Sequence, residues 1–166
     1  MDSIENLKYP IGKYKWSSSQ PTAEQKRNLL EALINFPEQL REEVKGLNET
    51  QLQTPYREDG WSTQVVHHLA DSHTHAYLRC KHALLEKRPE IKDYTEADWA
   101  TLEDATSNDL SPSLPILKGI HSRWAKFFKS LSDDEFNLEY NHLERSKNYP
   151  LYIVFELYTF HSLHHL

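Results

Sequence analysis

The chain has 166 residues, a formal net charge of −6 at pH 7 and a single cysteine, Cys80. A chain of this size can form one domain around its own core without a disulfide, and its acidity and lack of a long apolar run argue against nucleic-acid or membrane partners. Because residues 1–5 also lack the basic and apolar regions of a signal peptide, and one cysteine suits a reducing compartment, we expect a cytoplasmic protein.

Residues 1–21 are predicted to form an irregular arm, and a long helix follows them. Thr22 and Gln25 match a capping box at the start of this helix. Apolar residues then recur at steps of three and four as far as Leu47, which is the pattern of one buried helical face. Pro37 interrupts the pattern and is expected to kink the helix, because proline lacks the N–H of a helical hydrogen bond.

Three further amphipathic helices are predicted, over about residues 62–87, over residues 114–131 and from Pro150 onwards. The connection before the third helix favours a brief helical turn, and the connection before the fourth favours short strand pairing. Four amphipathic helices with two long connections predict an all-α four-helix bundle, with residues 1–166 as a single domain. Such bundles hold metal sites between facing helices.

Two histidines of the predicted fourth helix, His161 and His165, are four residues apart, so they lie on one face and about 6 Å apart along the axis. His68 lies on the apolar face of the second helix. A lone histidine on such a face is more often a hydrogen-bonded core residue than a ligand. Three buried imidazoles on two helices, however, would leave several polar nitrogens without hydrogen-bond partners unless the three rings bind a common ligand.

Three neutral imidazoles with positions left for water form the ligand set of a catalytic metal site. We therefore predict one divalent ion per chain, held by His68, His161 and His165. With imidazoles of ordinary pKa near 6.5, protons should displace the ion between about pH 6 and 5.

Other side chains compete with this set or could support it. His164 is the alternative partner of His161, and a histidine-rich helix end also suits the helix dipole without any metal. Asp71 follows His68 by three residues and either orients a ligand imidazole or is a solvated charge. His121 falls on the apolar stripe of the third helix, where it lines the pocket or has a structural role. No pattern assigns a role to the following histidines: His73, His75, His82 and His142.

Several separated motifs resemble the YfiT-like branch of the DinB superfamily, in the same order and spacing along nearly the whole chain. They lie at residues 9–14 (YPIGKY), 54–57 (TPYR), 60–73 (GWSTQVVHHLADSH), 121–124 (HSRW) and 158–165 (YTFHSLHH). The resemblance implies a four-helix bundle that forms homodimers and binds zinc or nickel through three histidines and water.

Matched motif to motif, the implied ligands fall on His68, His161 and His165. Members of the family continue for two or three helical turns beyond the last of these histidines, whereas this sequence ends at Leu166. Two alternatives stay open: either the residues that would follow are not part of the sequence given, or the last helix stops early, with His165 in a fraying turn and a weakened metal affinity.

The sequence leaves two activities open. A metal held by three histidines lowers the pKa of a bound water and polarises a carbonyl, and the resemblance implies on this basis a metal-dependent hydrolase with a small-molecule substrate. Relatives in the wider superfamily resemble S-transferases that join a low-molecular-weight thiol such as bacillithiol to an electrophile. The absence of an evident glutamate base fits thiol transfer, because a metal-bound thiolate needs no base. A metal-binding dimer without catalysis is the third possibility.

Overall fold

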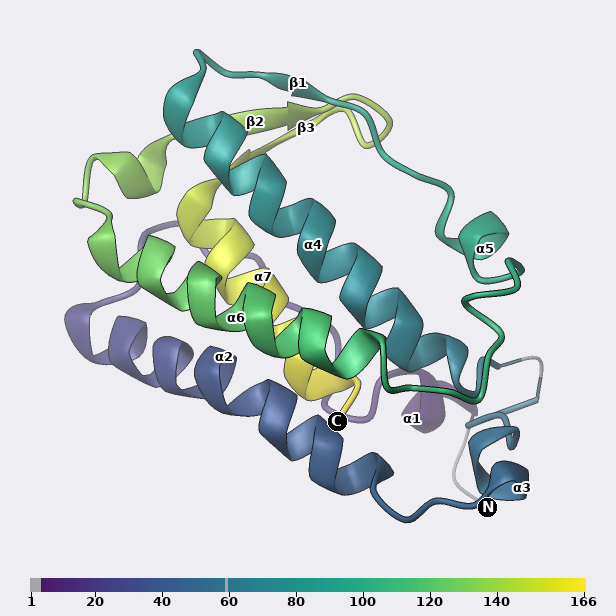
Figure 1. The fold of residues 1–166 in the computed structure, drawn as a ribbon. Helices are drawn as coiled ribbons and strands as arrows, with labels where there is room; N and C mark the ends of the chain where they lie inside the picture. Colours follow the sequence, from purple (N-terminus) through teal and green to yellow (C-terminus); the bar gives the residue numbers. More distant parts are fainter. Residues whose placement is uncertain (1–3, 59) are drawn as a thin grey trace.

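Four long helices pack side by side in the computed structural model, which describes residues 4–58 and 60–166 (Figure 1). These helices are α2 (Ala23–Val44), α4 (Gln64–Leu85), α6 (Ser113–Ser130) and α7 (Leu151–His164). Helix α6 packs against both α2 and α4, and α7 packs against the same two helices. The predicted all-α four-helix bundle is confirmed.

Helix α2 begins where the sequence predicted. The Thr22 hydroxyl accepts a hydrogen bond from the backbone N–H of Gln25, whose side chain accepts one from the N–H of Thr22. Pro37 is buried inside α2, which continues past it to Val44. Because proline has no N–H, the carbonyl of Leu33 has no helical donor four residues further on.

A small sheet lies across one end of the bundle (Figure 1). Strands β2 (Glu139–His142) and β3 (Lys147–Pro150) pair in antiparallel fashion, and β1 (Glu90–Ile91) adds to β2 in parallel. The predicted strand pairing is thus confirmed. Pro150 ends β3 and stands immediately before α7, one position earlier than its predicted place as the first helical residue.

Short helices occupy parts of the arm and of the connections. The brief helical turn predicted before the third long helix is α5 (Glu96–Trp99), and α3 (Glu49–Leu52) lies in the connection that follows α2. A 3₁₀ turn covers Glu135–Asn137. The arm is not irregular throughout, because α1 (Ile4–Lys8) forms within it, with an acidic residue in its first turn and a basic one in its last, as the helix dipole favours. Residues 1–3 of the predicted arm, and residue 59 of the polar connection, lie outside the described residues.

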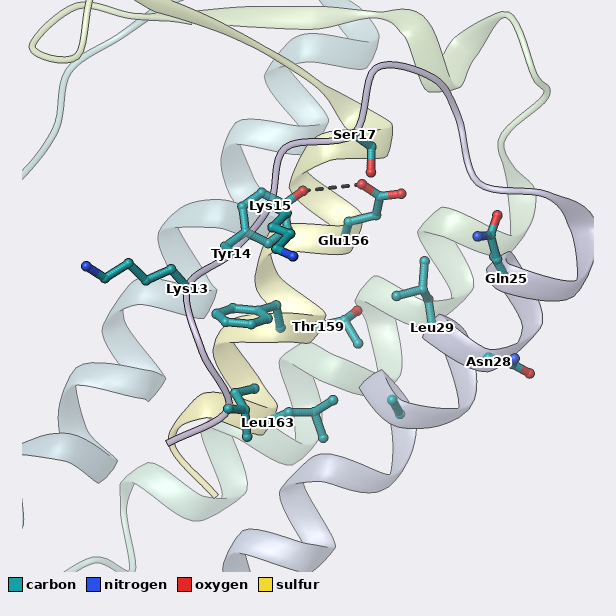
Figure 2. Close-up of a pocket in the computed structure, with 13 residues that line it drawn as sticks. Lys13, Tyr14, Lys15, Ser17, Gln25, Asn28, Leu29, Glu156, Thr159 and Leu163 are labelled. Atoms are coloured by element: carbon teal, nitrogen blue, oxygen red, sulfur yellow. Dashed lines mark hydrogen bonds between the residues drawn. The ribbon is translucent and has the colours of Figure 1, made fainter. Parts of the chain in front are cut away.

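After α1 the arm runs along α7 and towards α2 (Figure 2). The Tyr14 hydroxyl donates a hydrogen bond to Oε2 of Glu156 (3.3 Å), and the rings of Tyr14 and Phe160 lie 5.5 Å apart. The arm, α2 and α7 form the walls of an open hollow on this side of the bundle. The arm therefore contacts the face of α7 that carries Glu156 and Phe160.

Two groups of buried apolar side chains fill the interior. One surrounds Trp124 and Phe128 towards the sheet, and the other surrounds Phe36 and Leu69. The imidazole of His73 lies between the two groups, with its centroid 5.9 Å from the ring of Phe36 and 6.1 Å from that of Trp124. Within the described residues, no helix combines the length and the apolar character needed to cross a membrane.

Candidate metal centre

Three histidines converge where the end of α7 meets the first half of α4. The ring nitrogens of His68, His161 and His165 that could serve as ligands lie within 4.8 Å of one another. One helical turn separates His161 from His165, so their ring centroids are 4.7 Å apart. The ring of His68 meets both edge-on, at 5.5 and 6.0 Å. The structure thus brings together the same three residues that the sequence singled out.

The end of α7 decides which of two adjacent histidines joins this group. His164 is the last helical residue, and His165 follows it with its backbone N–H donated to the carbonyl of His161 (3.3 Å). The ring of His164 instead stacks on Phe160 at 6.0 Å and lies 6.4 Å from Tyr9 of the arm. His164 therefore faces the N-terminal arm, while His165 faces α4.

Burial keeps the three imidazoles neutral at pH 7. It lowers the pKa of His68 to about 4. Burial, together with the neighbouring imidazoles of His164 and His68, lowers the pKa of His165 to about 3. The pKa of His161 lies well below its ordinary value for the same reasons, burial first and then the proximity of His165. A neutral imidazole is the form that binds a metal ion.

The donor set fits a divalent ion of the zinc or nickel type. Imidazole nitrogens bind both metals well. They lie about 2.0–2.1 Å from a zinc ion, so two nitrogens on one ion are about 3.4 Å apart. A spread of at most 4.8 Å is close to this spacing. The indole of Trp61 lies beside His68, with 5.1 Å between ring centroids, and forms an aromatic wall on that side.

His73, to which the sequence assigned no role, lies directly behind this group. Its Nε2 is 2.9 Å from Nδ1 of His161, and its Nδ1 is 2.7 Å from Nε2 of His121. His121 is fully buried within this series of hydrogen bonds, which favours the structural one of its two predicted roles. The available signal was that His73 follows Leu69 by four residues and precedes Ala76 by three, which places it on the core-facing stripe of α4.

His67 is held away from the metal group by two hydrogen bonds. A carbonyl oxygen can only accept, so His67 donates its Nε2–H to the carbonyl of Ser107 (2.9 Å). Its Nδ1 then accepts from the hydroxyl of Ser113 (2.8 Å). Both nitrogens are therefore used to tie the start of α6 and the preceding loop to α4.

Asp71 does not have the surroundings of a residue that orients a ligand. Burial raises the pKa of its carboxyl, as does the nearby Asp104, whereas His67 lowers it. None of the hydrogen bonds formed by the described residues joins Asp71 to His68. Asp71 lies four residues after His67 and three after His68, and the groups that affect the pKa of its carboxyl are Asp104 and His67 rather than a ligand imidazole.

We expect Asp71→Asn to leave the metal affinity within about twofold of the wild type, because supporting residues that do orient a ligand cost about 10–100-fold when removed. The affinity is measured by titration of zinc against a competing chelator. A tenfold loss with unchanged helix content would place Asp71 behind a ligand after all.

Comparison with known proteins settles the family. The sequence profile of the DinB superfamily matches residues 32–166. The chain belongs to the DinB superfamily. A relative from Geobacillus thermodenitrificans, which has the provisional name metal-dependent hydrolase, is 41% identical over 166 residues, covering 99% of this chain and 93% of its own. YfiT of Bacillus subtilis has the same provisional name and is 40% identical over 162 residues, covering 97% and 90%.

The likeness of this DinB superfamily chain to YfiT extends to the fold. The solved structure of YfiT, described as a probable metal-dependent hydrolase with an unusual four-helix bundle topology, matches with a TM-score of 0.93 at 40% identity. The match covers 96% of this chain and 91% of YfiT. The resemblance stated from the sequence motifs is therefore confirmed.

Proposed function

We propose that this protein is a metal-dependent hydrolase of small molecules, with His68, His161 and His165 as the ligands of one zinc or nickel ion. The observation that carries the proposal is the convergence of three neutral imidazoles within 4.8 Å. The provisional names of two relatives at 40–41% identity support the same assignment.

The bound ion supplies Lewis acidity, which lowers the pKa of water towards 7 and polarises a substrate carbonyl. The protein supplies three nitrogens from two helices, and a set of only three leaves positions for water and substrate. His68 reaches the site from α4, His161 reaches it from α7 and His165 from the residue that directly follows α7, so the site depends on the packing of these two helices. The indole of Trp61 lies beside His68, with 5.1 Å between the ring centroids.

One observation favours thiol transfer as a second candidate. The group that the structure gathers consists of histidines alone, and the neighbours that affect the pKa of Asp71 are Asp104 and His67. A hydrolase commonly uses a nearby base to take a proton from water, whereas a thiol gives a nucleophilic thiolate without a protein base once it binds a metal. The substrates of this candidate are a low-molecular-weight thiol and an electrophile.

Two parallel assays test these proposals. Protein loaded with zinc or nickel is incubated with a panel of esters and amides, and separately with a low-molecular-weight thiol and a chromogenic electrophile. Turnover of the first panel, lost in His161→Ala and kept in His164→Ala, is the result expected of the hydrolase. Turnover of the thiol and electrophile alone would replace it with the transferase. A wild type that binds metal and turns over neither would overturn both.

A further inference from the structure

A chain of hydrogen bonds crosses the bundle and ends on a proposed metal ligand. The carbonyl of Leu33 in α2 lies 2.6 Å from Nδ1 of His121 in α6. Nε2 of His121 lies 2.7 Å from Nδ1 of His73 in α4, whose Nε2 lies 2.9 Å from Nδ1 of His161 in α7. Each of the four long helices contributes one residue to this chain.

The direction of every hydrogen bond in the chain follows from its first acceptor. A carbonyl oxygen cannot donate, so His121 must carry its proton on Nδ1. A neutral ring has one N–H, so Nε2 of His121 accepts from Nδ1–H of His73. By the same reasoning, Nε2 of His73 accepts from Nδ1–H of His161. Nε2 of His161 is then the nitrogen that keeps a lone pair.

Pro37 explains why this carbonyl is available. In a regular helix the carbonyl of Leu33 would accept from the N–H of residue 37, and proline has none. A buried carbonyl without a donor is costly, and Leu33 is fully buried. The Nδ1–H of His121 supplies the missing donor from the neighbouring helix α6. The interruption that the sequence shows at Pro37 thus leaves an acceptor in the core.

We infer that His73 and His121 are positioning residues, which together with the Leu33 carbonyl hold His161 in the tautomer whose Nε2 is free to bind the metal. The inference rests on the proposed role of His161 as a ligand. Metal-binding histidines ordinarily donate their second N–H to a carboxylate, a backbone carbonyl or water. Here the carbonyl of Leu33 has this role indirectly, because the imidazoles of His121 and His73 lie between it and His161. If the chain ran in the opposite direction, Nε2 of His161 would carry the proton and could not bind an ion.

Nitrogen NMR of the metal-free protein tests the direction of the chain. Long-range proton–nitrogen spectra distinguish an imidazole protonated on Nδ1 from one protonated on Nε2. We expect the Nδ1–H form for His121, His73 and His161, although free histidine in water favours Nε2–H. Finding Nε2–H on His161 in the wild type would overturn the inference without reference to metal binding or activity.

The metal affinities of variants test whether this series of hydrogen bonds affects metal binding. His73→Phe should lower the affinity for zinc by about 10–100-fold, as loss of an orienting partner does. His121→Phe touches no proposed ligand, yet it should lower the affinity in the same direction and raise the Nε2–H fraction of His161. His73→Gln retains one donor and one acceptor, and it should recover part of the loss. His75→Phe is the matched control on α4, because the His75 ring stacks on Tyr94 outside the chain (4.6 Å).

The outcomes separate this inference from the proposed function. A wild type that binds neither zinc nor nickel would overturn the proposed function and the inference with it. A wild type that binds, with His73→Phe and His121→Phe binding equally well, would overturn the inference alone. If His73→Phe fails to fold, as judged by circular dichroism, the comparison of His73→Gln with His121→Phe decides: equal affinity to wild type in both contradicts the inference.

Discussion

His165→Ala should abolish binding of a divalent ion, whereas His164→Ala should leave the affinity within about twofold of the wild type, since only a removed ligand or supporting residue costs 10-fold or more. The first variant removes one of three converging nitrogens, and the second removes a ring that stacks on Phe160 beside the arm. Elemental analysis after dialysis gives the stoichiometry, and competition with a chelator gives the affinity.

The same pair of variants should differ in thermal stability. An ion that binds only the folded state adds about 2.7 kcal/mol when its concentration is 100 times its dissociation constant. His164→Ala should keep this gain on addition of zinc, and His165→Ala should lose it. If His164→Ala loses the metal while His165→Ala keeps it, the end of α7 is rotated by one residue from the arrangement in the structure.

Lowering the pH from 7 to 5 should strongly destabilise the metal-free fold. Burial lowers the pKa of His68 and of His121 to about 4 and that of His165 to about 3, and it holds those of His73 and His161 well below their ordinary value. In the unfolded chain each ring binds a proton near pH 6.5. Between pH 6.5 and about 4 the unfolded state therefore holds more protons, and the free energy of unfolding falls as the pH falls.

The free energy of unfolding should depend steeply on pH. Each buried ring contributes about 1.4 kcal/mol per pH unit within this window. Several such rings acting together reach the same order as the 5–15 kcal/mol that stabilises a typical domain. Urea unfolding in the presence of chelator at pH 7.5, 6.5 and 5.5 measures the effect. His121→Phe should flatten this slope by about one proton, because it removes one of the buried rings whose pKa is lowered. A midpoint that is constant across the three pH values would contradict the prediction.

The lowered pKa values of the buried histidines also change the predicted effect of acid on metal binding. Rings of ordinary pKa would exchange the ion for protons between about pH 6 and 5 while the bundle stays folded. In the structure the folded rings of His68 and His165 take up protons only near pH 4 and below. Acid should therefore remove the metal mainly by unfolding the protein, so helix content and bound metal should disappear together.

The parts of the fold that could be predicted from the sequence are those set by local spacing. Apolar steps of three and four and the capping box at Thr22 placed the helices, and the four-residue step placed His161 and His165 on one face. The rotation of one helix against another is not local. The roles of His73 and His121 depend on which faces of α4 and α6 meet, and periodicity does not define that. The sequence left two roles open for Asp71 for the same reason, because His67 and His68 lie on different faces of one helix and either could be its neighbour.

The series of hydrogen bonds that connects Leu33 with His161 also limits how the four helices can slide past one another. Apolar side chains such as leucine and phenylalanine can repack after a shift of one helical turn, about 5.4 Å, but a hydrogen bond cannot stretch over that distance. A slip of any one helix would leave buried imidazole nitrogens without partners, a costly state. We therefore expect the chain to select one alignment among several that the apolar faces allow. Helix α2 contributes no proposed ligand, yet its alignment is tied through Leu33 to the place where the ion would bind.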